Sequence, residues 1–150
     1  MSEHLLITGG AGFIGSHLCQ RLLTRGDRVT VLDNFNDYYD PARKRRNVER
    51  VSGHEGFHLV EGDIRDTDLV ERLFAGDGPG GRFDAVIHLA ARAGVRPSLA
   101  QPILYEDVNC IGTLRLLEAA RKHDIERFVF GSSSSVYGIN RKVPFSESDP

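Results

Sequence analysis

Three glycines near the N-terminus have the spacing of a phosphate-binding turn. An apolar run at residues 5–7 leads through Gly9, Gly12 and Gly15 directly into a sequence with helical periodicity. Glycine lets the chain turn sharply, lets its backbone approach a pyrophosphate and lets a helix pack closely on a strand. Amide N–H groups at the start of the helix would then face the anion. The pattern favours dinucleotide binding, although an ordinary strand-to-helix turn has similar glycines.

A carboxylate follows these glycines at the separation that a dinucleotide site requires. The apolar residues 29–32 predict a second strand, and Asp33 stands at its end, about 20 residues beyond the glycine turn. An acid in this place hydrogen-bonds the adenosine ribose and repels a phosphate there, which favours NAD over NADP. Strand, glycine turn, helix, strand and acid therefore occur in the order expected of an NAD site.

The rest of the chain predicts strands that alternate with helices. Ile14, Leu18 and Leu22 form one helical stripe, and Gly26 is a plausible terminator of that helix. Further strands are expected at residues 57–60, 85–89 and 128–130, and further helices at 41–51, 66–74 and 101–123. Parallel strands need crossover connections, so the predicted fold class is α/β, a Rossmann-type doubly wound parallel sheet. Ligands of such sheets bind beyond the carboxyl ends of the strands.

Length and composition narrow the possible classes of protein. The chain has 150 residues, 40% of them hydrophobic and 27% charged, which is typical of one globular domain and short for a two-domain enzyme. The net charge of -2 argues against nucleic acid as the main partner. No apolar run approaches the ~20 residues of a membrane span, and no secretory leader precedes the first strand, so we predict a cytoplasmic protein without a membrane partner.

The basic run and the thiols have simpler interpretations than a site. Residues 43–46, Arg-Lys-Arg-Arg, are interpreted as the solvated face of a short helix in preference to a phosphate site. Cys19 and Cys110 are expected to be reduced and partly buried in helices. His54 and His58 are separated by glycines that break a helix, and no metal site is predicted.

Several stretches together resemble the extended short-chain dehydrogenase/reductase superfamily, in its NAD-dependent nucleotide-sugar epimerase and dehydratase branch. The resemblance covers residues 5–150 and rests on residues 8–15, 33–34, 62–64, 88–91, 109–113 and 132–138. The finer stretches 33–39, 93–96 and 143–146 look most like UDP-glucuronate 4-epimerases, and somewhat less like UDP-glucose 4-epimerases.

This resemblance implies a set of cofactor-binding residues. Phe13 and Ile14 would flank the pyrophosphate, and Asp33 would hold the adenosine ribose. Asp63 would border the adenine, although a turn or helix-capping role is an equal alternative. Asn109 would contact the cofactor or, alternatively, bridge its helix to neighbouring backbone. The predicted cofactor-binding residues are Gly9, Gly12, Phe13, Ile14, Gly15, Asp33, Asn34, Asp63, Ile64, Leu89, Ala90, Ala91, Arg92 and Asn109.

The serine run at residues 132–135 distinguishes between reactions of the family. By resemblance, Ser133 is the catalytic residue that hydrogen-bonds the sugar hydroxyl undergoing oxidation; its alternative role is to satisfy backbone groups in a turn. Ser134 and Ser135 stand where dehydratases of the family have an Asp-Glu pair, and decarboxylating relatives have Glu at the second position. Neutral hydroxyls titrate too far from pH 7 to replace those carboxyls. Epimerisation is therefore favoured.

The resemblance implies a nucleotide-sugar 4-epimerase that oxidises its UDP-sugar transiently at C4 with bound NAD. The proton acceptor of this family lies in a Tyr-x-x-x-Lys motif, which the chain lacks, because Tyr137 is followed by Arg141 at that spacing. We therefore predict that residues 1–150 are a truncated NAD-binding domain, without the C-terminal sugar-nucleotide domain and with little turnover.

Other hypotheses remain open from the sequence. The chain fits a non-catalytic dinucleotide-binding module, and the parent protein fits a nucleotide-sugar reductase or dehydratase of the same family. Missing strands would leave a sheet edge and an apolar surface uncovered, so a homodimer or larger aggregates are expected in solution.

Overall fold

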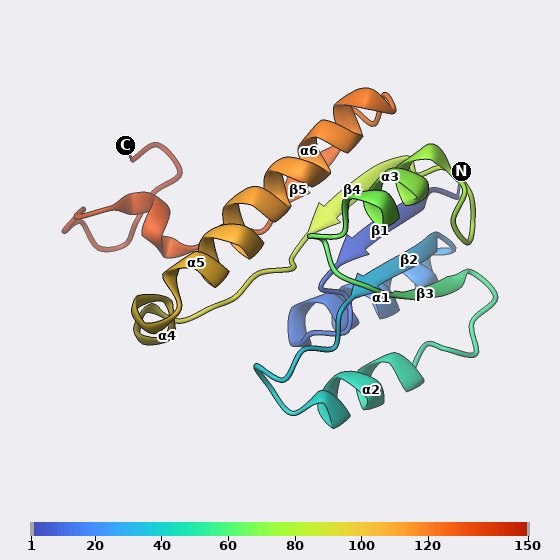
Figure 1. Cartoon of the computed structure of the whole chain (residues 1–150), viewed down its shortest axis with the longest axis horizontal. Coiled ribbons are helices and arrows are strands. Elements are labelled where there is room, and N and C mark those ends of the chain that lie inside the picture. The colour runs from blue at the N-terminus through green and yellow to red at the C-terminus, as the bar shows by residue number, and fades with distance from the viewer. Residues whose placement is uncertain (1, 150) are drawn as a thin grey trace.

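A five-stranded parallel sheet forms the centre of the computed structural model, which describes residues 2–149 (Figure 1). The spatial order is β3-β2-β1-β4-β5, and every neighbouring pair is parallel. Strand order reverses between β1 and β4, which is the point where ligands bind in such sheets. The predicted Rossmann-type fold class is confirmed. The strands are β1 (His4–Thr8), β2 (Arg28–Asp33), β3 (Phe57–Glu61), β4 (Ala85–His88) and β5 (Phe128–Phe130).

Helices connect the strands close to the predicted positions. The helix expected at 101–123 is continuous but contains a π-helical segment, Glu106–Gly112, between α5 and α6. A short helix, α4, was not predicted, and Ser134–Tyr137 forms one 3-10 turn. The α-helices are α1 (Phe13–Arg25), α2 (Pro41–Glu49), α3 (Thr67–Ala75), α4 (Val95–Ala100), α5 (Pro102–Tyr105) and α6 (Thr113–Lys122).

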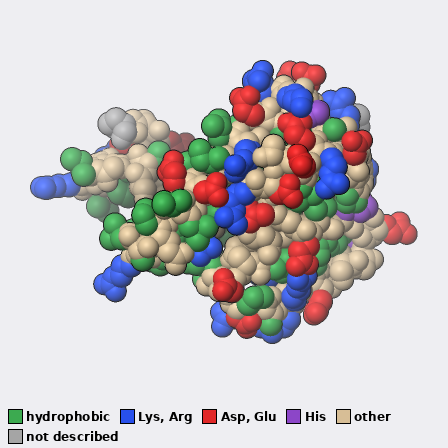
Figure 2. All heavy atoms as spheres, in the orientation of Figure 1, with side chains coloured by type: hydrophobic (Ala, Val, Ile, Leu, Met, Phe, Trp, Pro, Cys, Tyr) green, Lys and Arg blue, Asp and Glu red, His purple; other side chains and the backbone are tan. Residues whose placement is uncertain are grey.

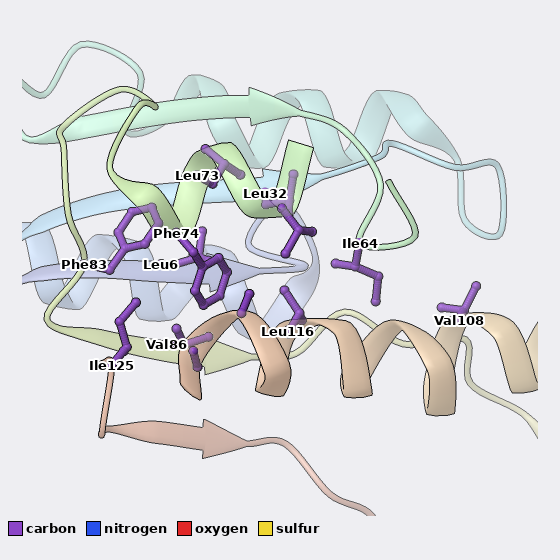
Figure 3. Close-up of a cluster of buried hydrophobic side chains, with 13 residues drawn as sticks. Leu6, Leu32, Ile64, Leu73, Phe74, Phe83, Val86, Val108, Leu116 and Ile125 are labelled. Atoms are coloured by element: carbon purple, nitrogen blue, oxygen red, sulfur yellow. The ribbon is translucent and has the colours of Figure 1, made fainter. Parts of the chain in front are cut away.

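Each face of the sheet carries its own core. Leu6 of β1 packs with Phe74 of α3 and Leu116 of α6 on one face (Figure 3). Leu5 and Ile7 point to the opposite face, which α1 covers. Because successive side chains of a strand alternate between faces, a parallel strand covered on both sides must be apolar almost throughout. The two cores hold the carboxyl ends of the strands in fixed positions.

Exposed apolar side chains gather at one end of the molecule. Hydrophobic residues cover α4 and α5 in Figure 2, where Leu99 and Ile103 are exposed. At the sheet edge, Val129 and Phe130 of β5 remain 58% and 54% exposed. Among the described residues, no helix has the length and apolar character needed to cross a membrane.

The two cysteines differ from each other. Cys19 is buried as expected, and burial raises the pKa of its thiol to about 12. Cys110 is exposed, so the prediction of partial burial is wrong there. The buried residues of its segment are Val108 and Gly112, one helical turn apart, and Cys110 lies between them on the outer side.

Candidate nucleotide-binding site

A cavity of about 670 Å³ opens at the carboxyl ends of the strands, at the point where their order reverses. The glycine turn, the ends of β2 to β4 and helix α2 all contribute to its wall. Ile14, Gly15, Arg92, Asn109 and Ser133 do not line it. The predicted residues that line it are Gly9, Gly12, Phe13, Asp33, Asn34, Asp63, Ile64, Leu89, Ala90 and Ala91.

The glycine turn needs its glycines for steric reasons. Gly9 has a φ of +70°, and a Cβ added there would lie 2.8 Å from the backbone nitrogen of Ala90. A Cβ at Gly15 would lie 2.6 Å from the carbonyl oxygen of Gly9. Gly9 therefore permits the turn to contact the end of β4. Gly15 acts by packing the first turn of α1 against the loop, which explains why it is absent from the cavity wall.

The N-terminus of α1 is open to an anion. Its N-cap residue is Gly12, which has no side chain to cap the first amides, and its first turn contains no acidic residue. Phe13 and Ile14 are exposed. The first amide groups of a helix have no partner within the helix, and the helix dipole adds partial positive charge there. A phosphate is therefore well suited to this end of the cavity.

Asp33 lines the cavity, but its carboxylate is already hydrogen-bonded within the protein. One oxygen, Oδ1, accepts hydrogen bonds of 2.9 Å from the Phe35 amide and from Nζ of Lys44. The other, Oδ2, accepts one of 3.2 Å from the Ala11 amide. The residue thus holds the glycine turn against the end of β2, and Lys44 balances its charge.

The basic run at residues 43–46 divides between two environments. Arg45 extends over the Phe35 ring, 3.7 Å from its centroid, and forms a bidentate surface pair with Glu61. The solvated interpretation is wrong for Lys44, whose side chain is only 12% exposed. A buried carboxylate such as Asp33 requires a nearby cation. The spacing of residues 43–46 along the chain does not show that Lys44 meets this requirement.

Asp63 is both a turn residue and part of the cavity wall. Burial alone would raise its pKa, but hydrogen bonds from Arg65 and Asn34 lower that pKa to about 2. The Arg65 guanidinium contacts both carboxylate oxygens, at 2.9 and 2.8 Å, and Nδ2 of Asn34 donates at 2.7 Å. The capping role considered for Asp63 belongs to Asp66, which accepts from the Leu69 amide.

Asn109 bridges the π-helical segment to the loop that follows β4. Its Oδ1 accepts from the Arg92 amide at 2.8 Å, and its Nδ2 donates to the Arg92 carbonyl at 2.9 Å. The structure therefore shows the bridging alternative. Sequence reasoning missed Tyr38 and Tyr105, whose hydroxyls both donate to the Ala93 carbonyl in the same loop.

A buried chain of hydrogen bonds also supports this loop. The Ala90 amide donates to Oγ1 of Thr8, which lies 2.6 Å from Nδ1 of His88. His88 Nε2 lies 2.8 Å from Oγ1 of Thr113, which donates to the Asn109 carbonyl. Because the Thr113 hydroxyl donates its proton to the Asn109 carbonyl, it accepts from Nε2–H of His88. Nδ1 of His88 then accepts from the Thr8 hydroxyl. Burial lowers the pKa of His88 to about 4, so the imidazole is neutral near pH 7.

Ser133 lies away from the cavity, at the start of the 3-10 turn. Its side chain is exposed, and its Oγ accepts from the Ser135 amide at 3.3 Å. This contact is the turn role considered as its alternative. Tyr137 of the same turn stacks on Phe145, with ring centroids 4.4 Å apart. Between residues 2 and 149, no cluster of three or more His, Cys, Asp or Glu is arranged to hold a metal ion.

The fold is that of a Rossmann-type domain, with a cavity at the reversal point of its sheet. The family described as GDP-mannose 4,6 dehydratase matches residues 6–150, and the chain belongs to it. UDP-glucuronate 4-epimerase 4 of Arabidopsis thaliana is 47% identical over 146 residues, which are 97% of this chain and 32% of the relative. An uncharacterized protein of Methanocaldococcus jannaschii is 44% identical over 150 residues, 98% of this chain and 44% of that protein.

Solved structures agree with this assignment. UDP-glucose-4-epimerase from Stenotrophomonas maltophila, with bound NAD and formylated UDP-arabinopyranose, has a TM-score of 0.82 and 34% identity over 98% of this chain and 42% of its own. The UDP-Glc/GlcNAc 4-epimerase from Campylobacter jejuni has a TM-score of 0.86 and 30% identity, and the match covers 99% of this chain and 43% of that chain. The resemblance to nucleotide-sugar epimerases is confirmed, and the chain spans less than half the length of these relatives.

Proposed function

We propose that the chain binds NAD in the cavity and forms the cofactor-binding domain of a longer nucleotide-sugar 4-epimerase. The observation that carries this proposal is the uncapped N-terminus of α1, which opens on a cavity at the reversal point of the sheet. The relatives named as UDP-glucuronate 4-epimerases and the NAD-containing epimerase structure support it.

The residues of the cavity fit this cofactor. The open turn between Gly9 and Gly12 suits the pyrophosphate, and the small side chains of Ala90 and Ala91 leave room for the nicotinamide half. A bound NAD would supply a reversible hydride acceptor for the sugar. This chain would bind the cofactor and orient it. The N-terminus of α1 would hold the phosphates, and the hydrogen bonds of His88 and Thr8 fix the loop at Ala90.

Among the reactions of the family, epimerisation suits this chain better than dehydration. Ser134 and Ser135 provide no carboxyl groups for an elimination of water. We propose UDP-glucuronate as the substrate of the whole protein, with UDP-glucose as the second candidate, and a role for Ser133 in hydrogen-bonding the reacting hydroxyl. Cytoplasmic location stays a prediction from the sequence.

The isolated chain is expected to bind NAD but not to convert UDP-glucuronate. Titration calorimetry should detect saturable NAD binding, because the residues proposed to hold the phosphates and the ribose lie within residues 2–149. Incubation with NAD and UDP-glucuronate should yield no UDP-galacturonate, because the chain lacks Tyr-x-x-x-Lys. A folded chain that gives no heat with NAD would contradict the cofactor proposal, whereas ready formation of UDP-galacturonate would contradict the inactivity of this segment. Activity of a longer form that contains the motif distinguishes an epimerase domain from a non-catalytic module.

Self-association is expected through the exposed apolar end of the chain. The β5 edge presents Val129 and Phe130, and Ile103 of α5 is also exposed. Light scattering should report dimers or larger species, and Val129→Lys combined with Ile103→Lys should shift them toward monomer, because charge blocks edge pairing. Ile139→Lys is the matched control, since Ile139 is exposed outside these elements. A monomeric parent chain would show this prediction to be wrong.

A further inference from the structure

Helix α2 and its C-cap residue place three arginines on the cavity wall. Arg43, Arg46 and Arg50 recur at helical spacing, and all three line the cavity together with Asn47. Nδ2 of Asn47 donates to the Ala11 carbonyl at 3.0 Å, which anchors this face of α2 on the glycine turn. Within residues 2–149, none of the three arginines takes part in an ion pair.

The acids of the cavity are already neutralised by other cations. Asp33 pairs with Lys44 at 2.9 Å, and Asp63 pairs with Arg65 at 2.8 Å. Arg43, Arg46 and Arg50 therefore give this wall a net positive charge. The pyrophosphate of NAD brings two negative charges, and a 2′-phosphate brings about −1.5 to −2 more at pH 7, as other phosphate monoesters do. Three arginines exceed the charge of the pyrophosphate by one, so this wall would balance part of the charge of an additional phosphate.

Lys44 changes what Asp33 presents to a ribose. A free carboxylate at this place repels a 2′-phosphate. Here the Asp33 side chain is only 2% exposed and shares a proton of Lys44. An ammonium has three donors, so Lys44 keeps two N–H groups while lining the cavity. A bound ribose would therefore meet the Lys44 ammonium beside an Asp33 carboxylate whose charge is already balanced. Repulsion of a 2′-phosphate should then be weaker than Asp33 alone would produce.

We propose that the ribose end of this cavity accepts a 2′-phosphate, so that the chain binds NADP as well as NAD, and that Lys44, with the exposed arginines of the same wall, determines this tolerance. The inference rests on the proposed function, because that function places the adenosine ribose beside Asp33. It concerns the adenosine half alone, and it can be tested without the nicotinamide or the sugar substrate.

Two probes without nicotinamide isolate the ribose end. Titration calorimetry on the chain compares ADP-ribose with 2′-phospho-ADP-ribose. We expect the two dissociation constants to agree within about tenfold, and we expect the phosphorylated probe to lose affinity more steeply with salt. If the phosphorylated probe binds more than about tenfold weaker, the inference is overturned while the proposed function stands. If neither probe binds the folded chain, both are overturned.

Substitutions on α2 assign the effect to particular residues. Lys44→Met and Arg46→Gln should each weaken 2′-phospho-ADP-ribose by about tenfold more than ADP-ribose, since each removes a charged donor to phosphate. Arg45→Gln is the matched control, because Arg45 is directed to Glu61 and does not line the cavity; both affinities should stay at their parent values. If Lys44→Met and Arg46→Gln, the latter at an exposed position, each weaken both probes equally, these residues do not determine the tolerance of a 2′-phosphate.

Discussion

Gly15→Ala is expected to abolish measurable NAD binding and to lower the free energy of unfolding by about 3 kcal/mol, at the upper end for overpacking. The new methyl group would lie 2.6 Å from the Gly9 carbonyl oxygen and 2.6 Å from the Gly10 Cα. Both atoms belong to the turn that surrounds the proposed phosphate site, so relief of the clash must displace the backbone that binds the cofactor. Urea unfolding and titration calorimetry with NAD measure the two effects.

A glycine elsewhere in the chain provides the control for this substitution. Gly53 has no heavy atom within 4 Å of an added Cβ and no left-handed backbone. Gly53→Ala should therefore change the free energy of unfolding by no more than about 0.5 kcal/mol and leave NAD affinity intact. Parent-like NAD affinity in Gly15→Ala would show that the first turn of α1 does not hold the pyrophosphate.

Acidification from about pH 7 to pH 4 is expected to remove about 3 kcal/mol of folding free energy through His88 alone. Burial lowers the pKa of this imidazole from 6.5 to about 4 in the folded state. Above pH 6.5 the imidazole is neutral in both states and makes no difference. Below it, the unfolded chain binds a proton that the folded chain excludes, so stability falls until about pH 4 and then levels. Urea unfolding at several pH values measures this loss.

Comparison with His88→Gln separates this contribution from those of other groups. Burial also lowers the pKa of His4, which destabilises the fold over an overlapping pH range, whereas the hydrogen bonds of Asp63 act at lower pH. Glutamine can donate and accept but cannot bind the proton, so the variant should lose less stability on acidification than the parent. His17→Gln, on the surface of α1, is the control. Parallel pH profiles for the parent and His88→Gln would show that His88 is not the responsible group.

Local patterns in the sequence were sufficient for the architecture. The apolar runs that became β1 and β2 and the terminator Gly26 are defined by neighbours within one or two turns. The predicted stripe through Ile14, Leu18 and Leu22 is only partly right, because Leu22 is buried and Leu18 half-buried but Ile14 is exposed at the open end of α1. The π-helical segment was not predictable, because one widened turn leaves apolar residues at nearly the same spacing. Helix α4 was missed because it is short and contains Pro97, which obscures its periodicity.

The sequence by itself determined the parallel α/β sheet, the glycine turn and the acid at the end of β2, since each depends on residue type and spacing along one stretch of chain. Only the tertiary structure decided that Asp33 is paired with Lys44, that Asn109 holds the Arg92 backbone, and that His88 is a neutral link between β1 and α6. These contacts join groups on different elements, and burial fixes their charge and direction. Hydrophobic periodicity in the sequence predicts which face of a helix or strand a residue occupies. The hydrogen-bond or ion-pair partner that it meets on that face depends on how the elements pack together.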